Sequence, residues 1–157
     1  MKKINLKGAN IFLRKIPELT KKKRSVLARK IVSQYTNSEL IESYKVGDYY
    51  WSASYTQGMI AVVISKNKVG IDVEKIVKRD RELFKISSVI RDWETFYRIW
   101  TGKEAIIKAF NLNLKNYEEI NYRNHDKSKT VFVYDKKLIK IDTIKYGNFF
   151  ISICFHK

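Results

Sequence analysis

With 157 residues, the chain is long enough for one compact domain, or for two small halves that share a core. Hydrophobic residues make up 45% of it and proline occurs once, which excludes general disorder and leaves little material for a flexible linker. The net charge of +16 indicates a polyanionic partner, but it does not choose among nucleic acid, an anionic membrane, a phosphorylated cofactor and an acidic protein.

The first third of the sequence predicts a strand followed by a helix. Residues 4–16 are strand-like, and Pro17 and Thr20 mark the start of a helix over 21–35. A shorter helical piece is expected within 38–44. In the longer helix, apolar residues recur at helical spacing and define the side that should be buried: Val26, Leu27, Ile31, Val32 and Tyr35.

The rest of the chain predicts strands around one long helix. Residues 48–56 are strand-like, and 59–76 read as two strands around a central turn, which is a hairpin signal. The charged stretch 75–84 is expected to be a loop or a short helix. Residues 91–110 are the strongest helix prediction, and 130–155 supply two or three closing strands. This order indicates an α+β fold with mostly antiparallel strands and one long helix in the second half.

Two carboxylates interrupt a run that otherwise reads as a core strand, in the sequence GIDVE. Side chains at i and i+2 of a strand share a face, so Asp72 and Glu74 project together, opposite Ile71 and Val73. Such a pair can bind one hard cation such as Mg²⁺, which proteins often hold with one or two carboxylates plus substrate phosphates. The alternative is an exposed strand face that carries ordinary acids.

The long predicted helix carries charged residues on the extension of its apolar face. The stripe at spacings of three and four consists of Trp93, Phe96, Tyr97, Trp100, Glu104, Ile107 and Lys108. A carboxylate and an ammonium on such a face are costly to bury without partners. Glu104 and Lys108 therefore have two interpretations. Either they form a surface salt bridge with each other, or Glu104 is a third carboxylate at the site of Asp72 and Glu74, with Lys108 beside it.

Two segments, GIDVEKI and FYRIWTGKEAIIKA, resemble the signature motifs of the 4′-phosphopantetheinyl transferase superfamily, in a shortened form of its surfactin-synthetase-type branch. The family pattern is a Gly-hydrophobic-Asp-hydrophobic-Glu strand followed by Trp-Ser/Thr-x-Lys-Glu-Ala/Ser-x-x-Lys. Every charged position of both motifs is present. Weaker similarity extends over residues 20–155. In WSASYT, Ser54 and Thr56 match family serines while Tyr55 stands at a histidine position, and elsewhere Arg24 and Lys45 match an arginine and a lysine.

The resemblance implies two similar α+β halves related by a pseudo-twofold axis, a shortened half over 1–67 and a half over 68–157 that carries both motifs. Coenzyme A would bind between them. The implied activity, of the holo-[acyl-carrier-protein] synthase type, moves the phosphopantetheine arm of coenzyme A to a serine of an acyl or peptidyl carrier protein. The by-product would be adenosine 3′,5′-bisphosphate.

The resemblance also implies a role for each matching residue. Asp72, Glu74 and Glu104 would hold Mg²⁺. Glu104 would take the proton of the carrier serine, directly or through a water, and Lys108 would stabilise the charge that develops on the pyrophosphate. The residues expected to contact the coenzyme are Arg24, Lys45, Ser54, Tyr55, Asp72, Lys103 and Lys108. Because a phenol carries no positive charge, Tyr55 in place of histidine is expected to weaken coenzyme binding.

Partners and location follow from charge and cysteine content. An acidic carrier protein fits the basic chain, and the loop 76–92 offers apolar residues for docking: Ile76, Val77, Leu83, Phe84 and Ile86. The lone Cys154 excludes an internal disulfide and favours the cytoplasm. A signal peptide and a membrane span are not expected, because every apolar stretch is too short, and a monomer is expected.

Two other functions remain open from the sequence. The basic helix predicted over 21–30 is compatible with binding nucleic acid, although no recognition motif accompanies it. A catalytically impaired homologue of the transferase fold is the other alternative.

Overall fold

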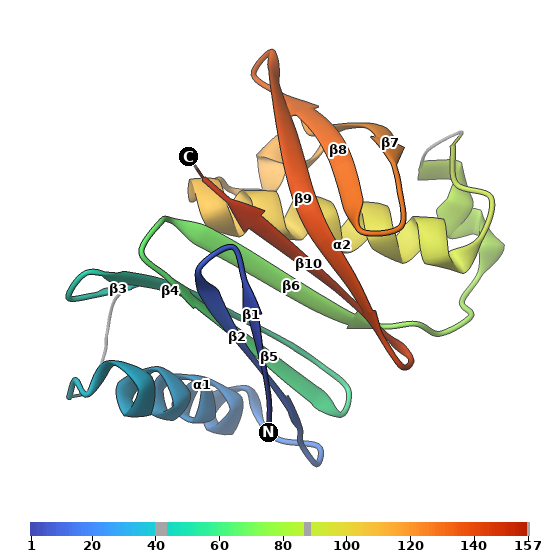
Figure 1. Cartoon of the computed structure of the whole chain (residues 1–157). Helices are drawn as coiled ribbons and strands as arrows, with labels where there is room; N and C mark the ends of the chain where they lie inside the picture. The colour runs from blue at the N-terminus through green and yellow to red at the C-terminus, as the bar shows by residue number, and fades with distance from the viewer. Residues whose placement is uncertain (40–43, 87–88, 157) are drawn as a thin grey trace.

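The computed structural model describes residues 1–39, 44–86 and 89–156, although not the side chains of residues 85 and 86, and places its strands in two five-stranded antiparallel sheets (Figure 1). The first sheet has the order β1-β2-β5-β4-β3. Its strands are β1 (Lys2–Leu6), β2 (Ala9–Lys15), β3 (Lys45–Val46), β4 (Tyr49–Thr56) and β5 (Met59–Ser65). Helix α1 (Lys21–Thr36) follows β2 and packs on the outer face of this sheet.

The second sheet has the order β6-β10-β9-β8-β7 and lies against the inner face of the first. Its strands are β6 (Val69–Lys75), β7 (Asn121–His125), β8 (Lys129–Tyr134), β9 (Lys137–Tyr146) and β10 (Phe149–Phe155). Helix α2 (Trp93–Phe110) packs on its outer face. Two short 3₁₀ helices flank α2 in the chain, η1 (Arg81–Ile86) before it and η2 (Leu114–Tyr117) after it.

The two sheets repeat one arrangement. The order β2-β5-β4-β3, with α1 after β2, matches the order β6-β10-β9-β8, with α2 after β6. Strands β1 and β7 are additions at opposite edges. The prediction of two similar α+β halves, with one long helix in the second, is confirmed. Among the described residues, no helix is both long and apolar enough to cross a membrane.

Helix α1 begins at Lys21 as predicted and extends one residue further, to Thr36, whereas α2 ends at Phe110 as predicted but begins two residues later, at Trp93. Thr20 caps α1 by accepting a hydrogen bond from the backbone of Lys23, and Asp92 caps α2 in the same way through Thr95. Each helix ends at an asparagine in the left-handed conformation, a geometry that asparagine tolerates better than most residues. On α1, Ile31 and Val32 are buried as expected, whereas Val26 is 58% exposed, so the prediction for Val26 was wrong.

Two strand predictions are corrected by the sheet topology. Residues 4–16 form the β1–β2 hairpin rather than one strand, because Lys7 and Gly8 adopt positive φ and turn the chain. The two strands in 59–76 exist as β5 and β6 but do not pair with each other. Strand β5 is buried along its whole length between β2 and β4, so no edge remains for β6, which pairs with β10. The helical piece predicted over 38–44 falls mainly outside the described residues.

Helix α2 approaches the β6 backbone most closely at Gly70, the glycine of GIDVE. A methyl group at Gly70 would lie 2.1 Å from the Ala105 carbonyl oxygen and 2.5 Å from the Ala109 amide nitrogen. Both atoms belong to the helix backbone and cannot move as a flexible side chain could. The absence of a side chain at Gly70 therefore fixes how near α2 lies to the strand that carries Asp72 and Glu74.

Replacing Gly70 with alanine is expected to destabilise the fold by about 3 kcal/mol or more, because the added methyl forces strand and helix apart. Urea unfolding at neutral pH measures this loss. Gly147→Ala is the matched control. Gly147 has open space around its would-be methyl and a φ of +57°, so only local backbone strain, about 1 kcal/mol, is expected there. Equal losses in the two variants would show that the close approach is not a constraint.

Candidate active site

Asp72 is the most buried acid of the site and has two direct partners. Its side chain is 7% exposed, and its Oδ1 accepts hydrogen bonds from Ser54 Oγ and Lys108 Nζ, each at 2.7 Å. Lys108 also donates to the carbonyl of Ile71 at 3.1 Å. The second oxygen of the same carboxylate, Oδ2, is buried without a hydrogen-bond partner in the described chain. Asp72 and Lys108, which the sequence predicts as separate site residues, thus form an ion pair between β6 and α2.

A row of hydroxyl groups on β4 joins the two halves at β6. Ser52, Ser54 and Thr56 alternate along β4 and share the face towards β6. Ser52 Oγ accepts from the Ile71 amide at 3.2 Å. Thr56 Oγ1 accepts from the Lys75 amide at 3.2 Å and donates to Glu74 Oε2 at 3.0 Å. Because β6 is an edge strand of its sheet, these hydroxyls satisfy backbone groups that would otherwise lack partners.

The negative charge of Asp72 raises the pKa of two other carboxyls, Glu74 on the same strand and Glu104 on α2. Burial raises the pKa of the Glu104 carboxyl, the negative charge of Asp72 raises it further, and Lys108 opposes both effects. The pKa of Glu74 is raised first by burial and then by Asp72, while the hydrogen bond from Thr56 lowers it. The three acids are therefore electrostatically coupled through Asp72.

The acids do not form a ready-made metal cage. Within the described ranges, no three Asp, Glu, His or Cys side chains lie close enough together to hold a metal ion. The buried Asp72 Oδ2, which has no protein partner, is nevertheless the kind of atom that a hard cation binds. Glu74 and Glu104 are the neighbouring carboxylates, so the residues present fit a Mg²⁺ held by few protein ligands and completed by substrate oxygens.

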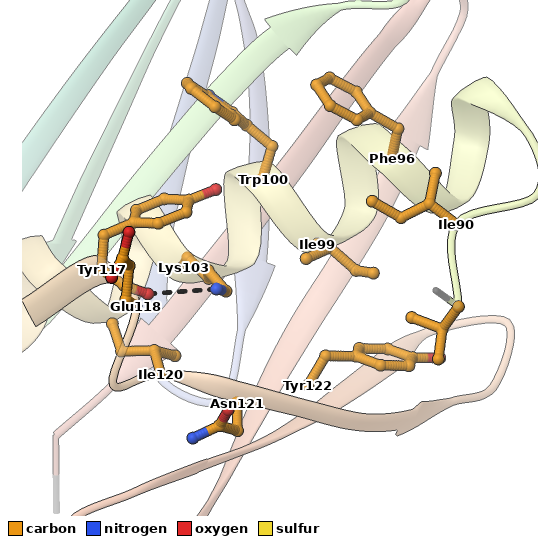
Figure 2. Close-up of a pocket in the computed structure, with 11 residues that line it drawn as sticks. Ile90, Phe96, Ile99, Trp100, Lys103, Tyr117, Glu118, Ile120, Asn121 and Tyr122 are labelled. Atoms are coloured by element: carbon orange, nitrogen blue, oxygen red, sulfur yellow. Dashed lines mark hydrogen bonds between the residues drawn. The ribbon is translucent and has the colours of Figure 1, made fainter. Parts of the chain in front are cut away.

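Lys103 faces a large cavity beside the middle of α2 (Figure 2). Its ammonium group donates to the Tyr117 carbonyl at 3.1 Å and lies 4.4 Å from the centroid of the Tyr117 ring. Burial lowers the pKa of Lys103. The cavity has a volume of about 660 Å³ and mostly apolar or aromatic walls: Val89, Ile90, Phe96, Ile99, Trp100, Lys103, Tyr117, Glu118, Ile120, Asn121 and Tyr122.

A second, smaller cavity of about 390 Å³ lies where both halves meet, at the C-terminal end of α2. Three lysines line it, Lys45 from the first half and Lys68 and Lys108 from the second. Lys45 and Lys108 were predicted from the sequence, whereas Lys68 and its neighbour in the wall, Ser52, were missed. Ser52 could have been found, since it precedes Ser54 by two residues and must share its face.

Arg24 and Tyr55 lie together, away from this cavity. The Arg24 guanidinium carbon is 5.4 Å from the centroid of the Tyr55 ring, and both side chains belong to the α1 face of the first sheet. Burial raises the pKa of the Tyr55 phenol. Because Ser54 and Tyr55 are adjacent on β4, they point to opposite faces, and the structure does not bring them to one point.

The loop before α2 packs largely onto the helix. Partly buried apolar residues from it contact the α2 core: Ile76, Val77, Leu83 and Phe84. The Tyr97 hydroxyl fixes the loop by donating to the Val77 carbonyl at 3.1 Å. The side chain of Ile86, the remaining member of the predicted docking patch, lies outside the described residues. Val89, at the mouth of the larger cavity, is 44% exposed.

Comparison with protein-family models agrees with the motifs and the fold. The model of the 4′-phosphopantetheinyl transferase superfamily matches residues 68–154, which contain β6, α2 and the remaining strands of the second sheet. The chain belongs to this superfamily. No curated protein matches the chain.

Removing the lysine of the Asp72 pair is expected to destabilise the protein. Lys108→Met leaves a buried carboxylate with Ser54 as the one remaining donor among the described residues, and we expect a loss of about 2–3 kcal/mol, reduced by the partial exposure of Lys108. Urea unfolding without divalent cations measures it. Lys30→Met on the exposed side of α1 is the control and should change stability by less than about 0.5 kcal/mol. Similar values for both variants would contradict the pairing.

The raised pKa of Glu104 gives a pH-dependent prediction. A carboxyl whose folded-state pKa is raised stabilises the fold while protonated, and this contribution is lost as pH rises through the folded-state pKa. Glu104→Gln should therefore be more stable than wild type at pH 7, by less than about 1 kcal/mol because solvent screens the partly exposed group. The difference should close towards pH 4. Unfolding across this range, with Glu94→Gln as the control on the same helix, measures it, and a pH-independent difference would contradict the coupling.

Proposed function

We propose that the protein transfers the phosphopantetheine arm of coenzyme A to a serine hydroxyl of an acyl or peptidyl carrier protein. One observation carries the proposal. Along α2, a centre that contains Asp72, Glu104 and Lys108 lies between two cavities. Ile107 and Lys108 line the smaller cavity, Trp100 and Lys103 line the larger, and Glu104 lies between these pairs on the helix. Membership of the superfamily supports the same activity.

The two cavities suit the two ends of coenzyme A. Phosphate groups need cationic donors, which Lys45, Lys68 and Lys108 provide in the smaller cavity. The pantetheine arm is a slender chain with amide groups, and the larger cavity offers it apolar walls with a few polar groups. In this orientation the pyrophosphate lies over Asp72 and Glu104. Arg24 and Tyr55 are not on this path, and their predicted contacts with the coenzyme remain predictions.

The reaction needs a base, a stabilised leaving group and alignment. The serine oxygen attacks the phosphorus that bears the pantetheine arm, and the bond from that phosphorus to the bridging oxygen breaks. Adenosine 3′,5′-bisphosphate leaves with the bonding electrons. Glu104 accepts the serine proton, directly or through a water, and burial together with the charge of Asp72 raises the pKa of its carboxyl in the absence of an ion. Lys108 lies beside Asp72 and balances the negative charge on the departing phosphate.

Asp72, together with Glu74 and Glu104, is proposed to hold Mg²⁺. When bound, the ion would neutralise pyrophosphate charge that the three carboxylates otherwise repel. Ser54 and Thr56 hold Asp72 and Glu74 through hydrogen bonds, but the three carboxylates would have to move closer together to share one ion.

The carrier protein is proposed to approach the open side of the larger cavity. A chain with a net charge of +16 attracts an acidic partner and speeds their encounter, more so at low salt. The exposed Val89 and the partly buried Trp100 supply apolar contact near the cavity mouth. We propose that the protein acts as a monomer in the cytoplasm, since the proposed centre is built from the two halves of one chain.

Incubation with coenzyme A, Mg²⁺ and an apo carrier protein should add the mass of one phosphopantetheine arm to the carrier, detected by mass spectrometry. Glu104→Gln should lower the rate about 10²–10⁴-fold, the range typical of a lost general base. Glu94→Gln, on the same helix, should keep the wild-type rate. Wild-type activity in Glu104→Gln would refute the site, and an unmodified carrier across several carrier classes would refute the proposed function.

A further inference from the structure

A third cavity, of about 700 Å³, lies away from the acids at the other side of the α2 terminus. It is bounded by the β1–β2 turn, the loop before β6, the end of α2 and the β8–β9 hairpin, close to the C-terminal end of β10. Its lining residues are Lys7, Asn67, Phe110, Lys129, Lys137, Leu138, Ile139, Lys140, Phe155 and His156. None of the motif acids contributes to it.

The cavity is strongly cationic, and most of its charge is not neutralised by the protein. Lys7 pairs with Asp142, which lies opposite Lys129 in the β8–β9 register. Among the described residues, no ion pair forms at Lys129, Lys137 or Lys140, and all three side chains are exposed. Lys129 and Lys140 extend from the same face of the β8–β9 ladder, whereas Lys137 extends from the opposite face. Like charges on one face raise the energy of the empty cavity. A multiply charged anion relieves this repulsion, and each charged hydrogen bond it accepts adds to its affinity.

Flat apolar surfaces accompany the lysines. The rings of Phe110 and His156 are stacked, with centroids 4.0 Å apart and an interplanar angle of 21°. Phe155 lies in the same wall, 5.8 Å from the Lys7 ammonium, and Leu138 is 69% exposed at the rim. A ligand that only carried phosphate would leave these surfaces in contact with water. A ligand with both a planar ring and phosphates would use the whole cavity.

We propose that this cavity binds a nucleoside polyphosphate, with the phosphates on Lys129 and Lys140 and the base against Phe155 and Leu138. The volume of the cavity lies within the usual range for such ligands. The site is separate from the proposed coenzyme cavity, although Asn67 and Phe110 of one are the chain neighbours of Lys68 and Asn111 of the other. The proposal does not depend on the transferase activity.

The test is isothermal titration with ATP at physiological salt, using the full chain. Wild type should bind ATP, and Lys129→Ala/Lys140→Ala should weaken binding about tenfold or more. Inorganic triphosphate should bind wild type more weakly than ATP does, because it lacks the ring. Lys30→Ala/Lys115→Ala removes the same charge from exposed positions on α1 and η2 and should retain wild-type affinity.

Three outcomes would overturn the proposal. Undiminished ATP binding by Lys129→Ala/Lys140→Ala would place the nucleotide elsewhere. Loss of binding in Lys45→Ala/Lys68→Ala alone would assign it to the coenzyme cavity. Equal loss in the Lys30→Ala/Lys115→Ala control, or equal affinity for triphosphate, would reduce the effect to general charge attraction. Circular dichroism of each variant separates lost binding from lost folding.

Discussion

The proposed centre depends on the contact of two backbones at Gly70. Strand β6 carries Asp72, and α2 carries Glu104 and Lys108, so the chemistry requires that strand and helix nearly touch. A second glycine serves the same helix on another side, since a methyl at Gly102 would lie 2.6 Å from the Phe132 ring. Thr101 adds a polar contact by lying 2.7 Å from Ser152 Oγ of β10. Packing thus explains the signature residues Gly70 and Thr101. The charged signature residues are those that this packing brings near one another, as Lys108 and Asp72 show.

Burying Asp72 next to other acids is energetically costly, and the structure offsets the cost locally. Ser54 and Lys108 both bond to one oxygen, and Lys108 reaches the strand carbonyl as well. The remaining oxygen has no hydrogen-bond partner among the described residues. The negative charge of Asp72 also raises the pKa values of Glu74 and Glu104. A site in this state is prepared for a positive ligand rather than for a substrate base or a hydrophobic group. The lysines of the adjoining smaller cavity, Lys45, Lys68 and Lys108, offer positive charge to an anion that binds together with that ligand.

Local periodicity allowed much of the fold to be predicted from the sequence. The alternation of GIDVE and the helical stripe through Glu104 and Lys108 depend on neighbours two to four residues away, and α2 was predicted together with the face from which Lys108 reaches Asp72. The pairing of β5 and β6 was predicted wrongly because a hairpin signal is also local. Which sheet a strand joins is decided by distant partners such as β2 and β10. Lys68 was missed for the same reason, since it reaches the cavity only through the docking of both halves.

The hydroxyl row on β4 has a consequence for how the molecule responds to its surroundings. Beside the Lys7–Asp142 ion pair, serine and threonine side chains of β4, which carry no charge, tie one half to the other, although the surface of the protein is highly cationic. Added salt screens the exposed lysines but leaves almost unaffected the hydrogen bonds that Ser52 and Thr56 accept from backbone amides of β6. Ionic strength should therefore govern which molecules gather around the protein while the seam between its two sheets stays closed.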